Sequence, residues 1–371
     1  MVLLMNLAII GASYLQLPLI EKAKQMGYTT HVFAWAAGDV GESAADHFYP
    51  ISIVEKEAIC AKCKEIDIVG ICSIASDLAA ITVNYVAEQL GLPGNTMEAT
   101  FKSTNKHAMR KAFEENADPS PKSILVDAAT DLTALNLTYP VIVKPTDRSG
   151  SRGIYKLDSA EHLQEAVTAA LSEGFEKKAL VEEFAEGQEY SVECISYQGT
   201  HHFLALTHKY TTGAPHFIET GHLEPAPVSA ETRMKVQQVV FHALDTLGIR
   251  NSASHSELKI AGDGTIKIIE IGGRMGGDCI GSDLVYHSTG IDFVKAVIDV
   301  ACGKEPDLTP VCQPTPVESR FIFTQEDFAE FQRIQKEESE RLIRVVDLHP
   351  ENIGSITDSS NRAGCYIIKA R

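Results

Sequence analysis

The sequence predicts an α/β protein in which a parallel sheet comes first, a mixed region follows and a small β-rich cap ends the chain. Residues 6–94 alternate apolar strands with helices, the order that produces a parallel sheet covered by helices on both faces. An Asp-Gly pair at 263–264, between two β-rich runs, predicts an antiparallel hairpin further along. A chain of 371 residues is too long for one simple core, so two or three domains are expected.

The first predicted domain spans residues 1–95. A strand over 6–11 passes through a turn at Gly11-Ala12-Ser13 into a helix that ends at Gly27. This turn lacks the GxGxxG pattern of dinucleotide sites, so a nicotinamide-dependent oxidoreductase is a distant alternative. Further elements of this domain are strands over 30–35 and 66–74 and a helix that ends before Pro93.

The second predicted domain spans residues 96–303, and the third spans 304–371. A helical connector opens the second domain and stops at the Pro119/Pro121 pair, and the proline-rich stretch 305–319 is typical of a boundary. The patterns between these points predict strands over 123–126, 140–145, 178–184, 189–197 and 201–210, and helices over 159–174, 230–248 and 290–303.

Composition and charge limit the classes of partner. The formal net charge of −17 argues against nonspecific binding of nucleic acid or of anionic membranes, which requires basic surface. Apolar runs stay shorter than the roughly 20 residues needed to span a bilayer. The eight cysteines are scattered rather than spaced as a disulfide framework, and no secretory signal precedes them. We therefore expect a cytoplasmic protein that acts on small molecules.

Two glutamates stand symmetrically about the predicted hairpin turn. If Asp263 and Gly264 form a two-residue turn, Glu257 and Glu270 lie directly opposite each other on one sheet face. Cross-strand neighbours have Cβ atoms about 4.5–5.5 Å apart, and like charges at that distance repel. A cation between the carboxylates would relieve this repulsion, and Mg²⁺ with nucleotide phosphates is the best match for hard oxygen ligands. An exposed edge hairpin with two solvated glutamates is the open alternative.

A second pattern follows a predicted strand that ends at Lys144. The loop after it is rich in serine and glycine over residues 149–153. Glycines let backbone N–H groups approach phosphate oxygens, and a lysine at the strand end supplies a point charge. This is not a Walker A loop, because the lysine precedes the glycines. The segment is either a phosphate-binding loop or a flexible surface hairpin.

A third pattern, EEFAEGQE over residues 182–189, makes the combination specific. Lys106 on a helix, VKP followed by the Gly/Ser loop, EEFxxGxE, and then Glu257 with EIxxR at 270–274 occur in this order. Together they resemble an ATP-grasp enzyme. The order is most similar to the carboxylate–amine ligase branch, which includes L-amino acid ligases and relatives of the large chain of carbamoyl-phosphate synthase.

The resemblance covers roughly residues 1–305 and implies a fold. A Rossmann-like domain would come first, followed by a two-subdomain ATP-grasp fold with a lid at about 122–185, and then a small C-terminal domain. ATP and Mg²⁺, or Mn²⁺ in its place, are the implied cofactors. Glu257 and Glu270 match the metal ligands, and Lys144 and Arg274 are implied as catalytic residues.

The resemblance also implies the nucleotide contacts. Lys106 and Lys144 match the phosphate-binding lysines, and Glu189 matches the acid that binds ribose hydroxyls. The other implied contacts are the phosphate loop (Ser149, Gly150, Ser151, Gly153), the hinge beside the adenine edge (Glu182, Glu183, Phe184, Ala185) and an apolar residue against the adenine face (Ile269).

One position departs from the family pattern. Many members have an asparagine two residues after the second glutamate as a third metal ligand, and this chain has Gly272 there. Water or substrate would then complete the shell of one metal ion. The polar, His-rich segment 207–229 offers Glu219 and His222 as substrate contacts, and Arg274 and Asp278 are further candidates. A solvated surface loop is the alternative for that segment.

These expectations give one leading function and two alternatives. The leading function is an ATP- and Mg²⁺-dependent ligase that joins a carboxylate, expected to be that of an amino acid, to an amine through an acyl phosphate and releases ADP and phosphate. The first alternative is a purine-pathway type of enzyme acting on a ribonucleotide. The second is a nucleotide-binding regulatory protein without turnover, motivated by Gly272. A homodimer is common among relatives.

Overall fold

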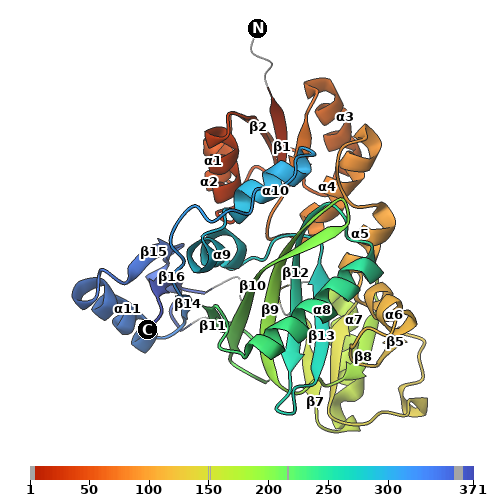
Figure 1. Cartoon of the computed structure of the whole chain (residues 1–371). Coiled ribbons are helices and arrows are strands. Elements are labelled where there is room, and N and C mark those ends of the chain that lie inside the picture. The colour runs from red at the N-terminus through yellow and green to blue at the C-terminus, as the bar shows by residue number, and fades with distance from the viewer. Residues whose placement is uncertain (1–4, 149, 151, 215–216, 355–361) are drawn as a thin grey trace.

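The computed structural model describes residues 5–148, 150, 152–214, 217–354 and 362–371. Within these residues the strands form three sheets, which are joined and covered by helices (Figure 1). The expected α/β class is confirmed, with a parallel sheet at the N-terminus and antiparallel sheets after it. None of the helices in the described ranges is long and apolar enough to cross a membrane.

The N-terminal sheet has the order β3-β2-β1-β4, and all its pairs are parallel. Strand β1 lies at its centre, where Leu7 and Ile9 face one apolar cluster and Ala8 and Ile10 face another. Helices α1 and α10 pack on the first face, and α3 and α4 pack on the second. The elements up to α4 are β1 (Asn6–Ile10), α1 (Leu17–Gln25), β2 (Thr29–Phe33), α2 (Val40–Ala44), β3 (His47–Tyr49), α3 (Lys56–Ile66), β4 (Gly70–Cys72) and α4 (Asp77–Leu90).

A small antiparallel sheet, β5-β8-β6-β7, is built from the segment that was expected to form the lid. Helix α7 packs its apolar face on this sheet. The connector before it is two helices, and the Asn105 side chain caps the second by accepting from Ala108 N at 3.0 Å. The elements are α5 (Met97–Thr104), α6 (Lys106–Glu115), β5 (Ser123–Val126), β6 (Val141–Pro145), β7 (Tyr155–Leu157), α7 (Leu163–Glu173) and β8 (Ala179–Glu183), with short turns at Leu132–Ala134 and Ala160–His162.

The large sheet has the order β13-β12-β9-β10-β11-β14-β16-β15. The last three strands in this order come from the C-terminal segment and join it through β11 and β14. Helix α8 packs on the sheet beside α6, and α10 returns to the N-terminal sheet (Figure 1). The elements are β9 (Gln188–Tyr197), β10 (Thr200–Thr211), β11 (Glu219–Glu224), α8 (Ala230–Leu247), β12 (Ser252–Ile260), β13 (Ile266–Gly272), η3 (Ile280–Leu284), α9 (Val285–Thr289), α10 (Phe293–Ala301), β14 (Val317–Ile322), α11 (Gln325–Glu337), β15 (Leu342–Val346), η4 (Pro350–Asn352) and β16 (Gly364–Lys369).

The β12–β13 hairpin closes differently from the prediction. Its tip is a three-residue loop over 262–264, in which Gly264 N donates to Ala261 O at 2.9 Å and Gly264 has φ +87°. The two-residue turn was therefore wrong, and this loop alone would place Glu257 opposite Ile269. A β-bulge between Glu257 and Leu258 adds one residue to β13 and shifts the pairing. The three-residue loop and the bulge shift the pairing by one residue in opposite directions. Glu257 therefore pairs with Glu270, as predicted.

Candidate active site

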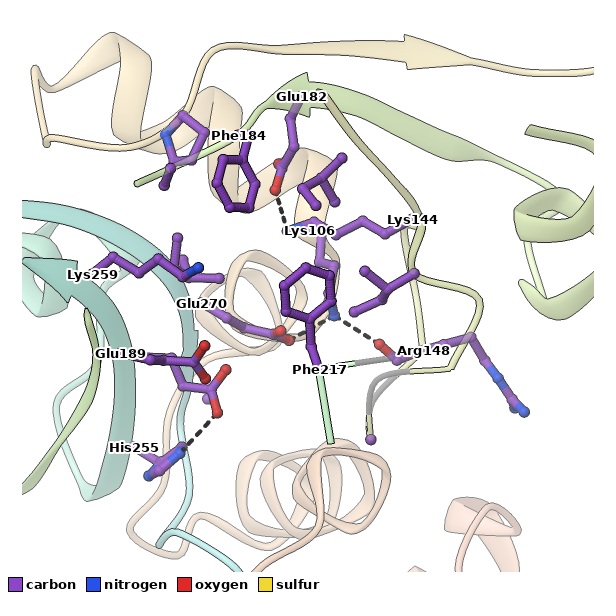
Figure 2. A pocket seen from close by; sticks show the side chains of 18 of the residues that line it. Lys106, Lys144, Arg148, Glu182, Phe184, Glu189, Phe217, His255, Lys259 and Glu270 are labelled. Atoms are coloured by element: carbon purple, nitrogen blue, oxygen red, sulfur yellow. Dashed lines mark hydrogen bonds and ion pairs between the residues drawn. The ribbon is translucent and has the colours of Figure 1, made fainter. Parts of the chain in front are cut away.

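Two adjoining cavities lie against the large sheet, the first between it and the small sheet and the second beside the N-terminal and C-terminal segments. The first collects side chains from both sheets and from the starts of α4 and α6 (Figure 2). The second, of about 640 Å³, shares Asp77, Glu257 and Arg274 with the first and is also lined by His222 and Asp278. Of the residues expected in the site, those that line the first cavity are Lys106, Lys144, Gly150, Glu182, Glu183, Phe184, Ala185, Glu189, Glu219, Glu257, Ile269, Glu270 and Arg274.

Four strands of the large sheet place their polar side chains in cross-strand rows. In the first row Glu189 on β9 pairs with Lys209 on β10 and Lys259 on β12. In the second row Glu257 pairs with Ser191 and Glu270, and in the third His255 pairs with Glu193 and Gly272. Period-two alternation puts residues of one strand that are two apart on one face. The cavity face of the sheet is therefore polar.

Each of the paired glutamates already has a lysine beside it. Lys106 Nζ donates to Glu270 Oε1 at 2.7 Å, and Lys209 Nζ donates to Glu257 Oε1. Lys209 also lies 3.4 Å from Glu189 and 3.6 Å from Glu219. Burial opposes ionisation of Glu257, but Lys209 and His255 outweigh it and hold the pKa of Glu257 well below its usual range. Both carboxylates thus lie against a lysine, which excludes the solvated edge hairpin.

The buried side chain of His255 lies between the carboxylates of Glu193 and Glu257. His255 Nδ1 contacts Glu193 Oε1, and its Nε2 lies 3.3 Å from Glu257 Oε1. Glu193 is fully buried and also accepts from Gly276 N at 2.9 Å. Burial lowers the pKa of His255, but the Glu193 carboxylate outweighs this effect and the pKa rises to about 9. His255 therefore carries a proton at neutral pH and adds positive charge beside Glu257.

A second buried ion cluster joins the small sheet to β13. Glu182 on β8 contacts Lys144 Nζ through Oε1 and accepts from Arg110 Nε through Oε2 at 3.1 Å. Arg110 Nη2 also donates to the Ile269 carbonyl at 2.7 Å, which the bulge in β13 makes available. Burial lowers the pKa of Lys144, while in Glu182 burial is outweighed by Arg110 and Lys144 and the pKa is lowered. The cluster fixes both the end of β6 and the bulge.

Aromatic and apolar side chains form the other wall of the first cavity. Phe184 follows β8 and Phe217 precedes β11, and Figure 2 shows both rings pointing into the cavity near Lys259. The Lys259 ammonium lies 4.9 Å from the Phe184 ring centroid and 5.8 Å from that of Phe217. Together with Ile142 and Ile269, these rings leave room for a flat apolar group beside the polar sheet face.

Arg274 connects the site to the N-terminal domain. Its Nε and Nη2 donate to the two carboxylate oxygens of Asp77 at 2.8 and 3.0 Å, a bidentate pair. Its Nη1 donates to Met275 O at 3.2 Å. Asp77 is the first residue of α4 and lies 197 positions before Arg274 in the chain. The arginine that was expected to bind the reacting acid is therefore held by a residue distant in the sequence.

Ion pairs also line the second cavity. Arg362 donates to Glu219 at 2.8 Å, lies 3.0 Å from Asp278, and stacks on Phe321 with 3.8 Å from its Cζ to the ring centroid. His222 is fully buried, and its Nε2 lies 3.7 Å from Asp278. Burial lowers the pKa of His222, so its ring is neutral at pH 7. Of the described lysine and arginine side chains in this cavity, Lys209, Arg274 and Arg362 each pair with a carboxylate, whereas Arg152, from the loop after β6, is exposed.

Some expected residues are not placed in either cavity. Gly153 has φ +68° and packs beside Glu173 and Pro145 instead. Ser149 and Ser151 lie outside the described residues, so the phosphate loop is represented in the cavities by Gly150 and Arg152.

Sequence reasoning missed several residues that the structure brings to the cavities. Glu193 and His255 could have been found, because each lies two or four residues from an expected acid on the same strand face. Lys209 lies on β10, and the pairing of β10 with β9, which places Lys209 beside Glu189, was not predicted. No local pattern indicated Asp77 or Arg362, which come from the N-terminal domain and the C-terminal segment.

Comparison with known proteins agrees with the resemblance in the sequence. A family model described as an ATP-grasp domain matches residues 137–283. The alanine–anticapsin ligase of Bacillus subtilis (strain 168) is 26% identical over 306 residues, and the alignment covers 73% of this chain and 64% of that protein. The chain thus spans less than two thirds of this relative's length.

Solved structures extend the likeness to almost the whole chain. L-amino acid ligase from Bacillus licheniformis is 25% identical with a TM-score of 0.80, over 98% of this chain and 93% of that one. Phosphoribosylglycinamide synthetase from Anaerococcus prevotii has a TM-score of 0.78 at 23% identity, over 98% and 94% of the two chains, which shows a shared fold. Residues 137–283 therefore match an ATP-grasp domain, as the order of the motifs indicated, and the chain is similar to an alanine–anticapsin ligase and an L-amino acid ligase.

Proposed function

We propose that this protein is an ATP- and Mg²⁺-dependent ligase that joins the carboxylate of an amino acid to an amine and releases ADP and phosphate. The observation that carries the proposal is the pairing of Glu257 with Glu270 at the wall of a cavity that also contains Lys106 and Lys144. Phosphoryl transfer requires positioning and charge neutralisation more than covalent help from the protein, and these side chains supply both.

The nucleotide would lie in the first cavity with its base between the apolar and aromatic side chains. Phe184 and Ile269 offer apolar faces on opposite sheets, and Glu189 lies further along the sheet face for the ribose hydroxyls. Lys106 and Lys144, which are 4% and 3% exposed, would then meet the phosphates. Both lysines have carboxylate partners at present, so they are held in place before the nucleotide arrives.

The two facing glutamates fit a hard divalent cation. No group of three or more histidine, cysteine, aspartate or glutamate side chains gathers for a metal within the described ranges. Glu257 and Glu270 would therefore hold Mg²⁺ together with phosphate and water oxygens, the usual arrangement for this ion. When bound, Mg²⁺ neutralises charge on the phosphates. Lys106 and Lys209 would share the carboxylates with it.

The second cavity would take the acid and the amine. Arg274 faces both cavities, so a carboxylate beside it lies next to the terminal phosphate. Activation then forms a bond from the substrate carboxylate oxygen to the γ-phosphorus, and ADP leaves. The amine attacks the carbonyl carbon, the C–O bond to phosphate breaks, and inorganic phosphate departs. Charge on the acyl phosphate is balanced by the Arg274 guanidinium.

The charges of the second cavity favour an amino acid over a ribonucleotide. A ribonucleotide brings a second phosphate, which needs basic side chains that are not already neutralised. In the described lining, Lys209 and Arg362 pair with carboxylates, and Arg274 is assigned to the reacting acid. Arg152 belongs to the loop expected at the nucleotide phosphates, and Glu219 and Asp278 add acceptors for an ammonium group. These groups suit a zwitterionic substrate better than a phosphorylated one.

Product analysis tests the proposal. Purified protein with MgATP and pairs of amino acids should release ADP and inorganic phosphate in equal amounts, and only when a suitable acid and amine are both present. AMP with pyrophosphate as products would overturn the mechanism. ADP release that required a ribonucleotide instead would support the purine-pathway alternative.

A variant pair separates an enzyme from a nucleotide-binding regulatory protein. Glu270→Gln removes one charge from the facing pair and should lower kcat by about 100- to 1,000-fold, comparable to loss of one preorganised electrostatic contact. Glu318→Gln is the matched control, because Glu318 pairs with Arg320 on the same sheet away from both cavities. Equal turnover in both variants would contradict the assignment, and absence of turnover in the unmodified protein would favour the regulatory alternative.

A further inference from the structure

Gly272 leaves a space that a residue from another domain fills. A Cβ built on Gly272 would lie 2.6 Å from Asp77 Oδ1 and 3.2 Å from Arg274 Nε. The first distance is shorter than any real contact between such atoms, and no flexible side-chain end could move aside without breaking an ion pair. Gly272 and Asp77 are therefore complementary, because a side chain at 272 and a carboxylate at 77 exclude each other.

Asp77 is anchored by more than its ion pair. It begins α4, and the preceding residue, Ser76, caps this helix by accepting from Ala79 N at 3.2 Å. The backbone also fixes this turn, because Ala75 N donates to Met275 O at 3.1 Å. Met275 O in turn accepts from Arg274 Nη1. The N-terminal domain thus contacts the Arg274 segment through both main chain and side chain.

We propose that Asp77 is a positioning residue for Arg274 that takes the space of a side chain at 272. The bidentate pair fixes the plane of the guanidinium. Nη1 gives one N–H to Met275 O, so one N–H of Nη1 and one of Nη2 remain for the substrate acid. This inference rests on the proposed function, since it assigns Arg274 to the reacting carboxylate. Asp77 acts through the arginine and makes no contact with substrate in this role.

Relocating the carboxylate tests the proposal. Asp77→Ala should lower kcat/KM for the acid about 10- to 100-fold, the usual cost of losing a group that orients a functional side chain. Gly272→Asp alone should be similarly impaired, because the new side chain collides with Asp77. The double variant Asp77→Ala/Gly272→Asp should regain about tenfold in kcat/KM, since the Cβ that carries its carboxylate would lie 3.2 Å from Arg274 Nε.

Further measurements separate positioning from other roles. Glu98→Gln is the matched control, because Glu98 is also an acid in the first turn of a helix and pairs with one cation, Lys102. It should leave kcat, KM and the melting temperature nearly unchanged. The KM for MgATP should stay within about twofold in the Asp77 variants, because the arginine serves the acid. A large rise in the Mg²⁺ concentration needed for half-maximal activity in Asp77→Asn would instead make Asp77 a metal ligand and overturn the proposal.

The failure of this inference can be told from the failure of the proposed function. If the unmodified protein shows no acid-dependent release of ADP, the proposed function fails. The contact is still reported by melting temperatures of Asp77→Ala, Arg274→Ala and the double variant, whose shifts should be clearly less than additive. Additive shifts, or a natively folded relocation variant that recovers no activity, would overturn the positioning role.

Discussion

Buried carboxylates in this protein differ in what compensates their charge. Glu182 and Glu257 each contact cations, and burial is outweighed in both. Glu224 is fully buried, unlike the partly exposed Glu257, and its hydrogen-bond partners are the hydroxyls of Thr207 and Ser288. Burial raises the pKa of Glu224 to about 7, because hydroxyl donors compensate a charge less well than a cation does.

The Glu224 carboxyl should make stability depend on pH. Its folded pKa of about 7 lies above the value of 4.5 that a glutamate has in an unfolded chain, so the unfolded chain releases the proton first as pH rises. The folded state therefore loses stability between about pH 4.5 and 7, by up to about 3 kcal/mol at about 1.4 kcal/mol per pKa unit. Glu224→Gln should remove this part of the pH dependence and melt higher than the unmodified protein at pH 8.

Melting temperatures from pH 5 to pH 8 check this expectation. The exposed Glu340→Gln should leave the pH dependence unaltered. A Glu224→Gln variant that loses stability equally at both pH values would show that the carboxyl is ionised in the folded protein.

At the scale of single residues, motif order identified Lys106, Lys144 and most of the acids that line the first cavity, but not Lys259 or Asp77. The facing pair and Lys106 were predicted because their spacing is local or follows a family order. Glu193 and His255 were within reach of the alternation rule. Asp77 was not, because its relation to Arg274 is a contact across 197 positions, which no local pattern encodes.

At the scale of elements, turn chemistry explains both a success and an error. Asp-Gly at 263–264 correctly predicted a hairpin between β12 and β13. The type of turn was wrong, because Gly262 precedes the pair and a three-residue loop with a left-handed Gly264 closes equally well. A bulge in an isoleucine-rich strand has no sequence signal of its own. The pairing of the two glutamates was therefore predicted correctly, although the predicted register between them and the turn was wrong.

Two glycines at turns of the large sheet should differ in their tolerance of alanine. Both have positive φ, +116° for Gly187 and +87° for Gly264. A Cβ on Gly264 meets nothing within 4 Å, so Gly264→Ala should cost about 1 kcal/mol of backbone strain. A Cβ on Gly187 would lie 2.3 Å from Ile260 O, so Gly187→Ala should cost roughly 3 kcal/mol or more.

Urea unfolding of the two glycine variants measures this difference. Gly187→Ala should also raise the KM for MgATP, because this turn lies between Ala185 and Glu189 in the first cavity. Equal destabilisation by the two substitutions would contradict the close approach of Gly187 to β12.

At the scale of the whole molecule, the fold class followed from strand–helix alternation and the rest depended on distant contacts. The parallel sheet and the hairpin were predicted, since each uses short-range patterns. The return of α10 to the N-terminal sheet and the union of β14, β15 and β16 with β11 were not. Both bring together segments far apart in the chain, and pairing partners of that kind are not specified by periodicity.

Because the first cavity lies between sheets, nucleotide should stabilise the molecule as a whole. MgADP at a hundred times its dissociation constant should add about 2.7 kcal/mol to the free energy of unfolding. A thermal-shift titration should show a higher melting temperature with MgADP than with ADP and EDTA. The Glu270→Gln variant should lose most of the part that depends on Mg²⁺. Equal shifts with and without Mg²⁺ would contradict a metal site at the facing glutamates.

The bulge in β13 also shortens the spacing along the strand between two residues that line the first cavity. A regular strand presents every second residue to one side, so two groups on that side stand about 6.6 Å apart along it. Here the neighbours Ile269 and Glu270 both line the first cavity, and adjacent Cα atoms are about 3.8 Å apart. One strand can therefore hold a heterocycle and an escorting ion at closer range than an unbroken ladder would allow.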